Sequence, residues 1–164
     1  MITYGVDTLY LADDKRLYPY QTLPHTSIVV NLFKEKKPQI ALMGASSIGR
    51  DLGPRVSSAL HSGLTADCTS LVIGDHYDNK QDKNYENLLY QIRPAFGGNI
   101  IATIVSPESF PSMATVRPGV MAIKKPEPER KAEVWKEKNA LTPEDYITEG
   151  IDIIEQERKV NLQA

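Results

Sequence analysis

A glycine- and serine-rich turn between two apolar stretches has the clearest chemical potential in this sequence. Residues 44–55 read Gly-Ala-Ser-Ser-Ile-Gly-Arg-Asp-Leu-Gly-Pro-Arg and follow the apolar run 39–43. A strand that leads through such a turn into a helix can offer backbone N–H groups and a helix N-terminus to an anion. The layout therefore suggests a nucleotide site as one hypothesis.

The spacing within this turn does not match the phosphate-binding motifs. Its glycines stand at positions 44, 49 and 53, which is not G-x-G-x-x-G, and Arg50 and Asp51 occupy the places where a P-loop needs Lys and then Ser or Thr. The turn also resembles a segment of short-chain dehydrogenases, but none of the eight tyrosines precedes a lysine by four residues, as catalysis by those enzymes requires. A structural or interface turn is favoured over a phosphate site.

No catalytic or metal site can be assembled from the remaining polar residues. Asp67 or His76 could act as a base in a small nucleotide-dependent hydrolase or dehydrogenase, but no nucleophile and oxyanion donors accompany them. The Asp- and Asn-rich stretch 74–87 lacks the sixth-position Gly and the closing Glu of an EF-hand, so we predict a solvated loop there. We predict no catalytic, cofactor-binding or metal-binding residue in this chain.

Several charged and polar residues stand at predicted turns or strand ends. We predict that they form turn networks or interface contacts, the alternative for each being an isolated surface charge. Asp67 interrupts a strand-like run, and its carboxylate could bond turn amides locally or pair with an arginine. The residues of this group are Arg50, Asp51, Arg55, Asp67, Arg93, Asn99 and Arg117.

Composition limits the class of protein. With 164 residues, 41% hydrophobic and 24% charged, the chain is predicted to form one globular domain with a real core. A net charge of −2 without basic clusters argues against nucleic acid as a partner. The single cysteine excludes an internal disulfide and suits a reducing cytoplasm, and we expect neither an export signal nor membrane insertion.

The order of predicted elements indicates an α/β fold. Residues 8–12 are predicted as a strand, 22–36 as an amphipathic helix and 39–43 as a buried strand. The helix after the turn carries apolar residues at intervals of four, with a kink or restart expected at Pro54. Residues 64–73 form a further predicted strand.

The second half of the chain is predicted to complete a mixed sheet. Strand patterns at 88–92, 99–105 and 113–116 are separated by lengths that suit hairpins. A charged, proline-bearing connector follows from residue 122 to 138, and Trp135 is expected to pack on the body. Thr142 begins a predicted helix in which Ile147, Ile151 and Ile154 share a face.

Four segments in order resemble the alpha subunit of electron transfer flavoproteins, over essentially the whole chain. They are Gly-Ala-Ser-Ser-Ile-Gly-Arg-Asp-Leu-Gly-Pro-Arg-Val (44–56), Gly-Leu-Thr-Ala-Asp-Cys-Thr (63–69), Arg-Pro-Ala-Phe-Gly-Gly-Asn-Ile-Ile-Ala-Thr-Ile-Val (93–105) and Met-Ala-Thr-Val-Arg-Pro-Gly-Val-Met (113–121). The resemblance implies a Rossmann-like mixed sheet of the adenine nucleotide alpha hydrolase-like type, with flanking helices and incomplete at the N-terminus.

The resemblance also implies a division of the chain. Residues 1–125 correspond to the N-terminal α/β domain of the family, and residues 126–164 to a connector, strand and helix that lead to an FAD domain. The Ser-Gly-Gly-Arg-Gly-type motif that opens the family's FAD domain does not occur here. We therefore expect a fragment, with a first strand or two missing, unpaired sheet edges and an exposed apolar face.

The resemblance implies electron transfer by the intact protein. The intact alpha subunit would form a heterodimer with a beta subunit and carry electrons on FAD from flavin dehydrogenases to an acceptor. The resemblance implies that the residues that bind FAD in this family lie outside this chain, so the chain alone is not expected to bind FAD. The alternatives are a flavin-free docking module for the beta subunit and, least favoured, a small nucleotide-binding α/β protein.

Overall fold

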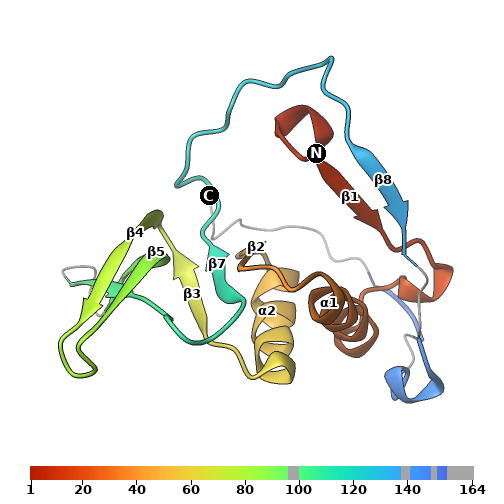
Figure 1. Cartoon of the computed structure of the whole chain (residues 1–164). Coiled ribbons are helices and arrows are strands. Elements are labelled where there is room, and N and C mark those ends of the chain that lie inside the picture. Colours follow the sequence, from red (N-terminus) through yellow and green to blue (C-terminus); the bar gives the residue numbers. More distant parts are fainter. Residues whose placement is uncertain (96–99, 138–140, 149–150, 155–164) are drawn as a thin grey trace.

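The computed structural model describes residues 1–95, 100–137, 141–148 and 151–154. These residues form two α-helices and eight strands, together with short 3-10 turns. Figure 1 shows their arrangement. The elements are η1 (Ile2–Tyr4), β1 (Thr8–Leu11), η2 (Lys15–Leu17), α1 (Thr22–Lys36), β2 (Ile40–Gly44), α2 (Ser47–Leu60), β3 (Leu64–Cys68), β4 (Ser70–Asp78), β5 (Lys83–Pro94), β6 (Ile101–Ile104), β7 (Ser112–Val116), β8 (Glu133–Lys136) and η4 (Pro143–Asp145).

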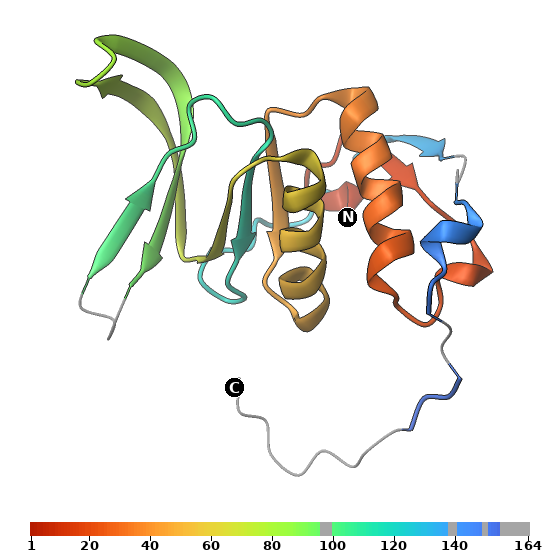
Figure 2. The same ribbon diagram turned by 90° about the horizontal axis from the view of Figure 1, so that it is seen from below.

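A parallel sheet of order β2-β7-β3 forms the centre of the fold. The helices α1 and α2 lie side by side on the same face of this sheet (Figure 2). The buried core lies between helices and sheet, where Val30 of α1, Ala41 of β2, Val56 of α2 and Met113 of β7 meet. A parallel sheet with crossover helices is the Rossmann-like arrangement, so the predicted mixed α/β fold class is confirmed.

The two helices begin and end where their sequences provide the signals. Ser46 caps α2, because its side chain accepts a hydrogen bond from the backbone N–H of Gly49 at 3.2 Å. Helix α1 ends at Lys37, whose left-handed backbone (φ 48°) is followed by Pro38. Helix α2 continues through Pro54, so the predicted restart there is wrong, although Pro54 has no N–H to donate to the Arg50 carbonyl.

An antiparallel sheet of order β4-β5-β6 projects from one side of the centre (Figure 1). The predicted strand 64–73 is in fact two strands, because β3 ends at Cys68 and β4 begins at Ser70. The predicted loop 74–87 is also wrong: it holds the end of β4, a tight turn and the start of β5. Backbone pairing between two long strands outweighs their polar composition.

A third, two-stranded sheet lies on the opposite side, where β8 pairs in parallel with β1. Trp135 of β8 remains 53% exposed and contacts the body through Lys36, whose ammonium lies 5.4 Å from the indole centroid. The helix predicted from Thr142 is wrong beyond its first turn. The 3-10 turn η4 ends at Asp145, and the described residues that follow it are not helical.

Candidate functional site

The carboxyl ends of the three central strands meet at one edge of the parallel sheet. Ser46 follows β2, Arg117 follows β7, and Asp67 is the penultimate residue of β3. Helix α2 starts at this edge and adds Arg50 from its first turn. Ligands and partners of open α/β sheets commonly bind at this edge, where loops carry the side chains that vary.

Asp67 is held in position by an irregularity of β3. The pairing with β7 shifts between Thr65 and Cys68, and Asp67 adopts a left-handed backbone with φ 61°. The Asp67 N–H donates to the hydroxyl of Thr115, a fully buried residue of β7, at 2.8 Å. Asp is one of the few residues that tolerate this conformation, which explains a carboxylate in the middle of a strand sequence.

Two guanidinium groups converge on the Asp67 carboxylate. Arg117 donates to Oδ2 through Nε at 3.1 Å and Nη2 at 2.6 Å, while Arg50 donates to Oδ1 through Nη2 at 3.3 Å. Arg50 is in turn fixed by a bond from its Nε to the Ala45 carbonyl at 2.9 Å. We call Arg50, Asp67 and Arg117 the edge cluster. It carries two positive charges and one negative charge.

The electrostatics of the edge cluster keep Asp67 ionised. Hydrogen bonding from Arg117 is the largest cause of the lowered pKa of Asp67. The charges of Arg117, Arg50 and Arg93 lower this pKa further, while burial raises it by less than the hydrogen bond lowers it. The same bond raises the pKa of Arg117. The Asp67 side chain is 20% exposed, whereas Arg50 and Arg117 keep 55% and 44% of theirs exposed. The guanidinium groups can therefore still reach an outside partner.

A hollow of about 490 Å³ lies at the edge cluster. Hydroxyl groups and the ionic side chains form most of its polar wall, and no imidazole or thiol is found among its described lining residues. Such a wall can hold polar or acidic groups in place, but it offers no nucleophile paired with a base. The lining residues are Ala45, Ser46, Ser47, Arg50, Asp67, Arg117 and Pro118.

Comparisons with known proteins place this chain in a family. Residues 1–141 match the family model described as electron transfer flavoprotein domain. The chain belongs to the electron transfer flavoprotein family. It is 42% identical over 164 residues to an electron transfer flavoprotein subunit alpha of Thermoanaerobacterium thermosaccharolyticum. The matched region covers 99% of this chain and 47% of the relative.

Two further relatives agree with this assignment. The electron transfer flavoprotein subunit alpha of Megasphaera elsdenii is 40% identical over 154 residues, which are 94% of this chain and 43% of the relative. Protein FixB of Clostridium saccharobutylicum is 43% identical over 158 residues, which are 96% of this chain and 44% of the relative. The predicted resemblance to the alpha subunit is confirmed, and the chain spans less than half the length of these relatives.

Three other predicted site residues of this electron transfer flavoprotein domain, Asp51, Arg55 and Arg93, do not join the edge cluster directly. Asp51 accepts hydrogen bonds from Thr22 at 2.5 Å and Tyr20 at 2.7 Å, which tie α2 to the start of α1 and lower the Asp51 pKa. Arg93 lies near enough for its charge to lower the Asp67 pKa.

Arg55 is exposed on α2, and Asn99 lies outside the described residues. The alternative in which Asp67 pairs with arginines is the one observed. An interface role for the group as a whole stays a prediction.

Sequence reasoning missed two residues that shape the site. Thr115 orients the Asp67 backbone, and Ser46 caps the helix that carries Arg50. A serine before an apolar-periodic segment is a recognisable cap signal, whereas nothing in the sequence connects Thr115 to a residue 48 positions away.

The described part of the chain contains no group of three or more His, Cys, Asp or Glu side chains that could hold a metal ion. None of the described helices is long and apolar enough to cross a membrane.

Proposed function

We propose that this chain is part of the alpha subunit of an electron transfer flavoprotein. The intact protein would carry electrons on FAD from flavin dehydrogenases to an acceptor, as a heterodimer with a beta subunit in the cytoplasm. The family match over residues 1–141 carries this proposal. Relatives that are named as alpha subunits and cover 94% and 99% of this chain support it. The chain would act as a carrier subunit and not as an enzyme.

The edge cluster does not fit a flavin dinucleotide. A pyrophosphate between Arg50 and Arg117 would meet the Asp67 carboxylate, which already accepts bonds from both guanidinium groups and would repel it. No large apolar or aromatic side chain among the described lining residues could cover an isoalloxazine ring. We therefore propose that this chain alone holds no FAD and that the flavin is bound elsewhere in the intact heterodimer.

The proposed contribution of this chain is a docking surface for the beta subunit. The edge cluster supports this idea, because its guanidinium groups are fixed by Asp67 and Ala45 yet stay half exposed. Charges held in one geometry at the rim of an interface select a partner and speed its association. Acidic side chains of the partner are the groups that this cluster would contact.

A binding experiment tests the docking role. The chain would be titrated against a purified electron transfer flavoprotein beta subunit by calorimetry at low salt. Arg50→Ala and Arg117→Ala should each weaken binding by roughly tenfold, because each removes a fixed rim charge. Lys34→Ala is the matched control, since Lys34 lies exposed on α1 away from the cluster. Equal affinity for all three variants and the parent chain would refute the docking role.

A spectrum separates the flavin-free module from a flavin carrier. The chain purified alone under mild conditions should show no visible flavin absorbance, whereas a full-length alpha subunit assembled with its beta subunit should show it. A stoichiometric flavin band in the isolated chain would contradict the proposed location of FAD.

A further inference from the structure

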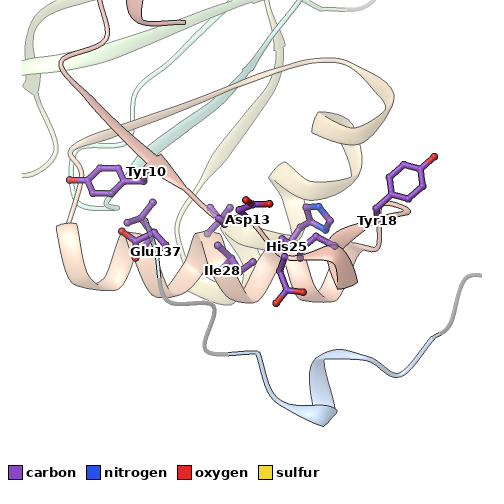
Figure 3. Close-up of a pocket in the computed structure, with 11 residues that line it drawn as sticks. Tyr10, Asp13, Tyr18, His25, Ile28 and Glu137 are labelled. Carbon is purple, nitrogen blue, oxygen red and sulfur yellow. The ribbon is translucent and has the colours of Figure 1, made fainter. Parts of the chain in front are cut away.

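A pocket of about 400 Å³ lies beside α1, and none of its described lining residues belongs to the edge cluster (Figure 3). These lining residues come from β1, from the segment around η2, from α1 and from the position directly after β8. The proposed docking surface uses none of them. A ligand bound in this pocket would therefore occupy a second, independent site.

The floor of the pocket is apolar and belongs to α1. Ile28, Val29 and Leu32 are partly buried and follow the spacing of one helix face, and we call them the apolar strip. Because a helix rises about 1.5 Å per residue, Ile28 and Leu32 are about 6 Å apart along the helix axis. Such a strip suits a hydrocarbon chain that lies along the helix.

Two carboxylates border the pocket at different points. The Glu137 N–H donates to the carbonyl of Leu11 at 2.9 Å, and Asp13 lies two residues beyond Leu11. Two residues of extended chain span about 7 Å, which sets the approximate spacing of the two acids. Figure 3 shows Glu137 near Tyr10 and Asp13 farther toward His25. The acids are therefore placed to contact two separate positive groups.

No lysine or arginine is found among the described lining residues of the pocket to offset these acids. A third lining carboxylate, Asp14, is bonded to Arg16 at 2.6 Å. Asp13 and Glu137 accept no hydrogen bond from the side chains that the structure describes. An occupant with two positive charges would therefore complement the pocket.

One end of the pocket already attracts an ammonium group of the chain itself. The Nζ of Lys36 lies 5.3 Å from the centroid of the Tyr10 ring and 5.4 Å from that of Trp135. Aromatic faces attract cations in this way. Glu35 contacts the same ammonium at 2.7 Å and offsets its charge. Since Tyr10 also lines the pocket, a ligand ammonium beside Glu137 would meet similar surroundings.

An organic cation fits the pocket better than a metal ion. The described residues contain no group of three or more His, Cys, Asp or Glu side chains that could hold a metal. A metal ion would also leave the apolar strip in contact with water, whereas the methylene chain of an organic cation would cover it.

We propose that the pocket binds a linear aliphatic diamine. One ammonium group bonds to Glu137 beside Tyr10, and the other bonds to Asp13. The methylene chain between them lies on the apolar strip. A chain of about five methylene groups suits the spacing of the two acids, since each single bond is about 1.5 Å long.

Titration of the complete chain with pentanediamine tests the proposal, with NMR and calorimetry at pH 7 and low salt. The amide signals of Ile28, Val29 and Leu32 should shift and reach saturation. Pentylamine has the same carbon chain but a single ammonium group. It should bind about tenfold more weakly, because it leaves one carboxylate without a partner.

Variants that remove one charge locate the two ammonium groups. Asp13→Asn and Glu137→Gln should each weaken pentanediamine binding about tenfold. Glu129→Gln is the matched control, because Glu129 is exposed between β7 and β8 and does not line the pocket. It should change the affinity less than about twofold. Circular dichroism establishes that each variant is folded, and the comparison of the two amines on the parent chain needs no variant.

Three results would overturn the proposal. The first is the absence of saturable shifts in the apolar strip at about 10 mM pentanediamine. The second is an equal loss of affinity in Glu129→Gln and in the two pocket variants, which would mean that the diamine binds the acidic surface in general. The third is equal affinity for pentylamine and pentanediamine, which would mean that the pocket holds a single ammonium group.

Discussion

The geometry of the β2–α2 turn decides whether replacing Gly49 by alanine stabilises or destabilises the fold. Within a helix, Gly→Ala ordinarily stabilises by about 1 kcal/mol. Here an added Cβ would overlap the carbonyl oxygen of Gly44 and lie 3.0 Å from its carbonyl carbon. Both are backbone atoms and cannot rotate away, so either the turn or the helix must move. We expect this overlap to outweigh the helix propensity of alanine.

The expected loss of stability follows from the cost of the overlap and the gain in helix propensity. Overpacking in a rigid site costs about 1–3 kcal/mol, and an overlap with backbone belongs at the upper end of that range. Subtracting the helix gain of about 1 kcal/mol leaves a net loss of about 2 kcal/mol for Gly49→Ala. For a chain of this size that loss corresponds to a Tm about 4–8 °C lower.

Urea and thermal unfolding followed by circular dichroism would measure the effect. Ser58→Ala is the matched control, because Ser58 is exposed on the same helix and its replacement should stabilise by about 0.5 kcal/mol. If Gly49→Ala proved as stable as the parent chain while the control behaved as expected, the close approach of Gly44 to Gly49 would be refuted.

Three further predictions concern the core and the edge cluster. Met113→Ala should lower the free energy of unfolding by about 2–5 kcal/mol in urea, because Met113 is fully buried in the core. Asp67→Asn keeps the left-handed backbone but loses the charge that Arg117 favours. Since the Asp67 pKa is lowered in the folded state, its stabilisation is complete above the ordinary carboxyl pKa of about 4 and is lost as the pH falls through the folded value. The stability difference between Asp67→Asn and the parent chain, measured in urea at pH 7 and pH 3, should therefore shrink at the lower pH. Burial raises the pKa of the Cys68 thiol, so a thiol reagent at pH 8 should modify Cys68 slowly in the folded chain and rapidly in urea.

The helices could be predicted from local sequence because their signals are local. Helix α1 forms over Thr22–Lys36 as the apolar spacing and the following proline indicate. The cap at Thr142 was also predicted: its N–H and hydroxyl bond to the Asp145 carboxylate at 2.7 and 3.1 Å. The helix nevertheless stops after one turn. Ile147, Ile151 and Ile154 are 76%, 98% and 83% exposed, so no element among the described residues covers the expected apolar face.

The edge cluster could be predicted only in part. Charged residues at turns and strand ends marked Arg50, Asp67 and Arg117 as candidates. Their meeting depends on parallel pairing that places the ends of β2, β7 and β3 at one edge. Each paired residue of β7 is 48 positions or more from its partner in β2 or β3. The part of the β4–β5 hairpin next to its turn was predicted as a loop, because most of its residues are exposed or only partly buried and many of them are polar.

The uncovered isoleucines and the open strand edges have a common physical explanation. A helix face or strand edge is stable when another element covers it, and local sequence encodes the element but not its partner. In this chain Leu42 of β2 and Ile151 of the terminal segment are 51% and 98% exposed, and Ile28 of α1 lines a hollow beside Tyr10 of β1. The central sheet and its two helices are nevertheless packed around Met113. The edge cluster rests on this packed part, so its geometry depends on β2, β7, β3 and α2.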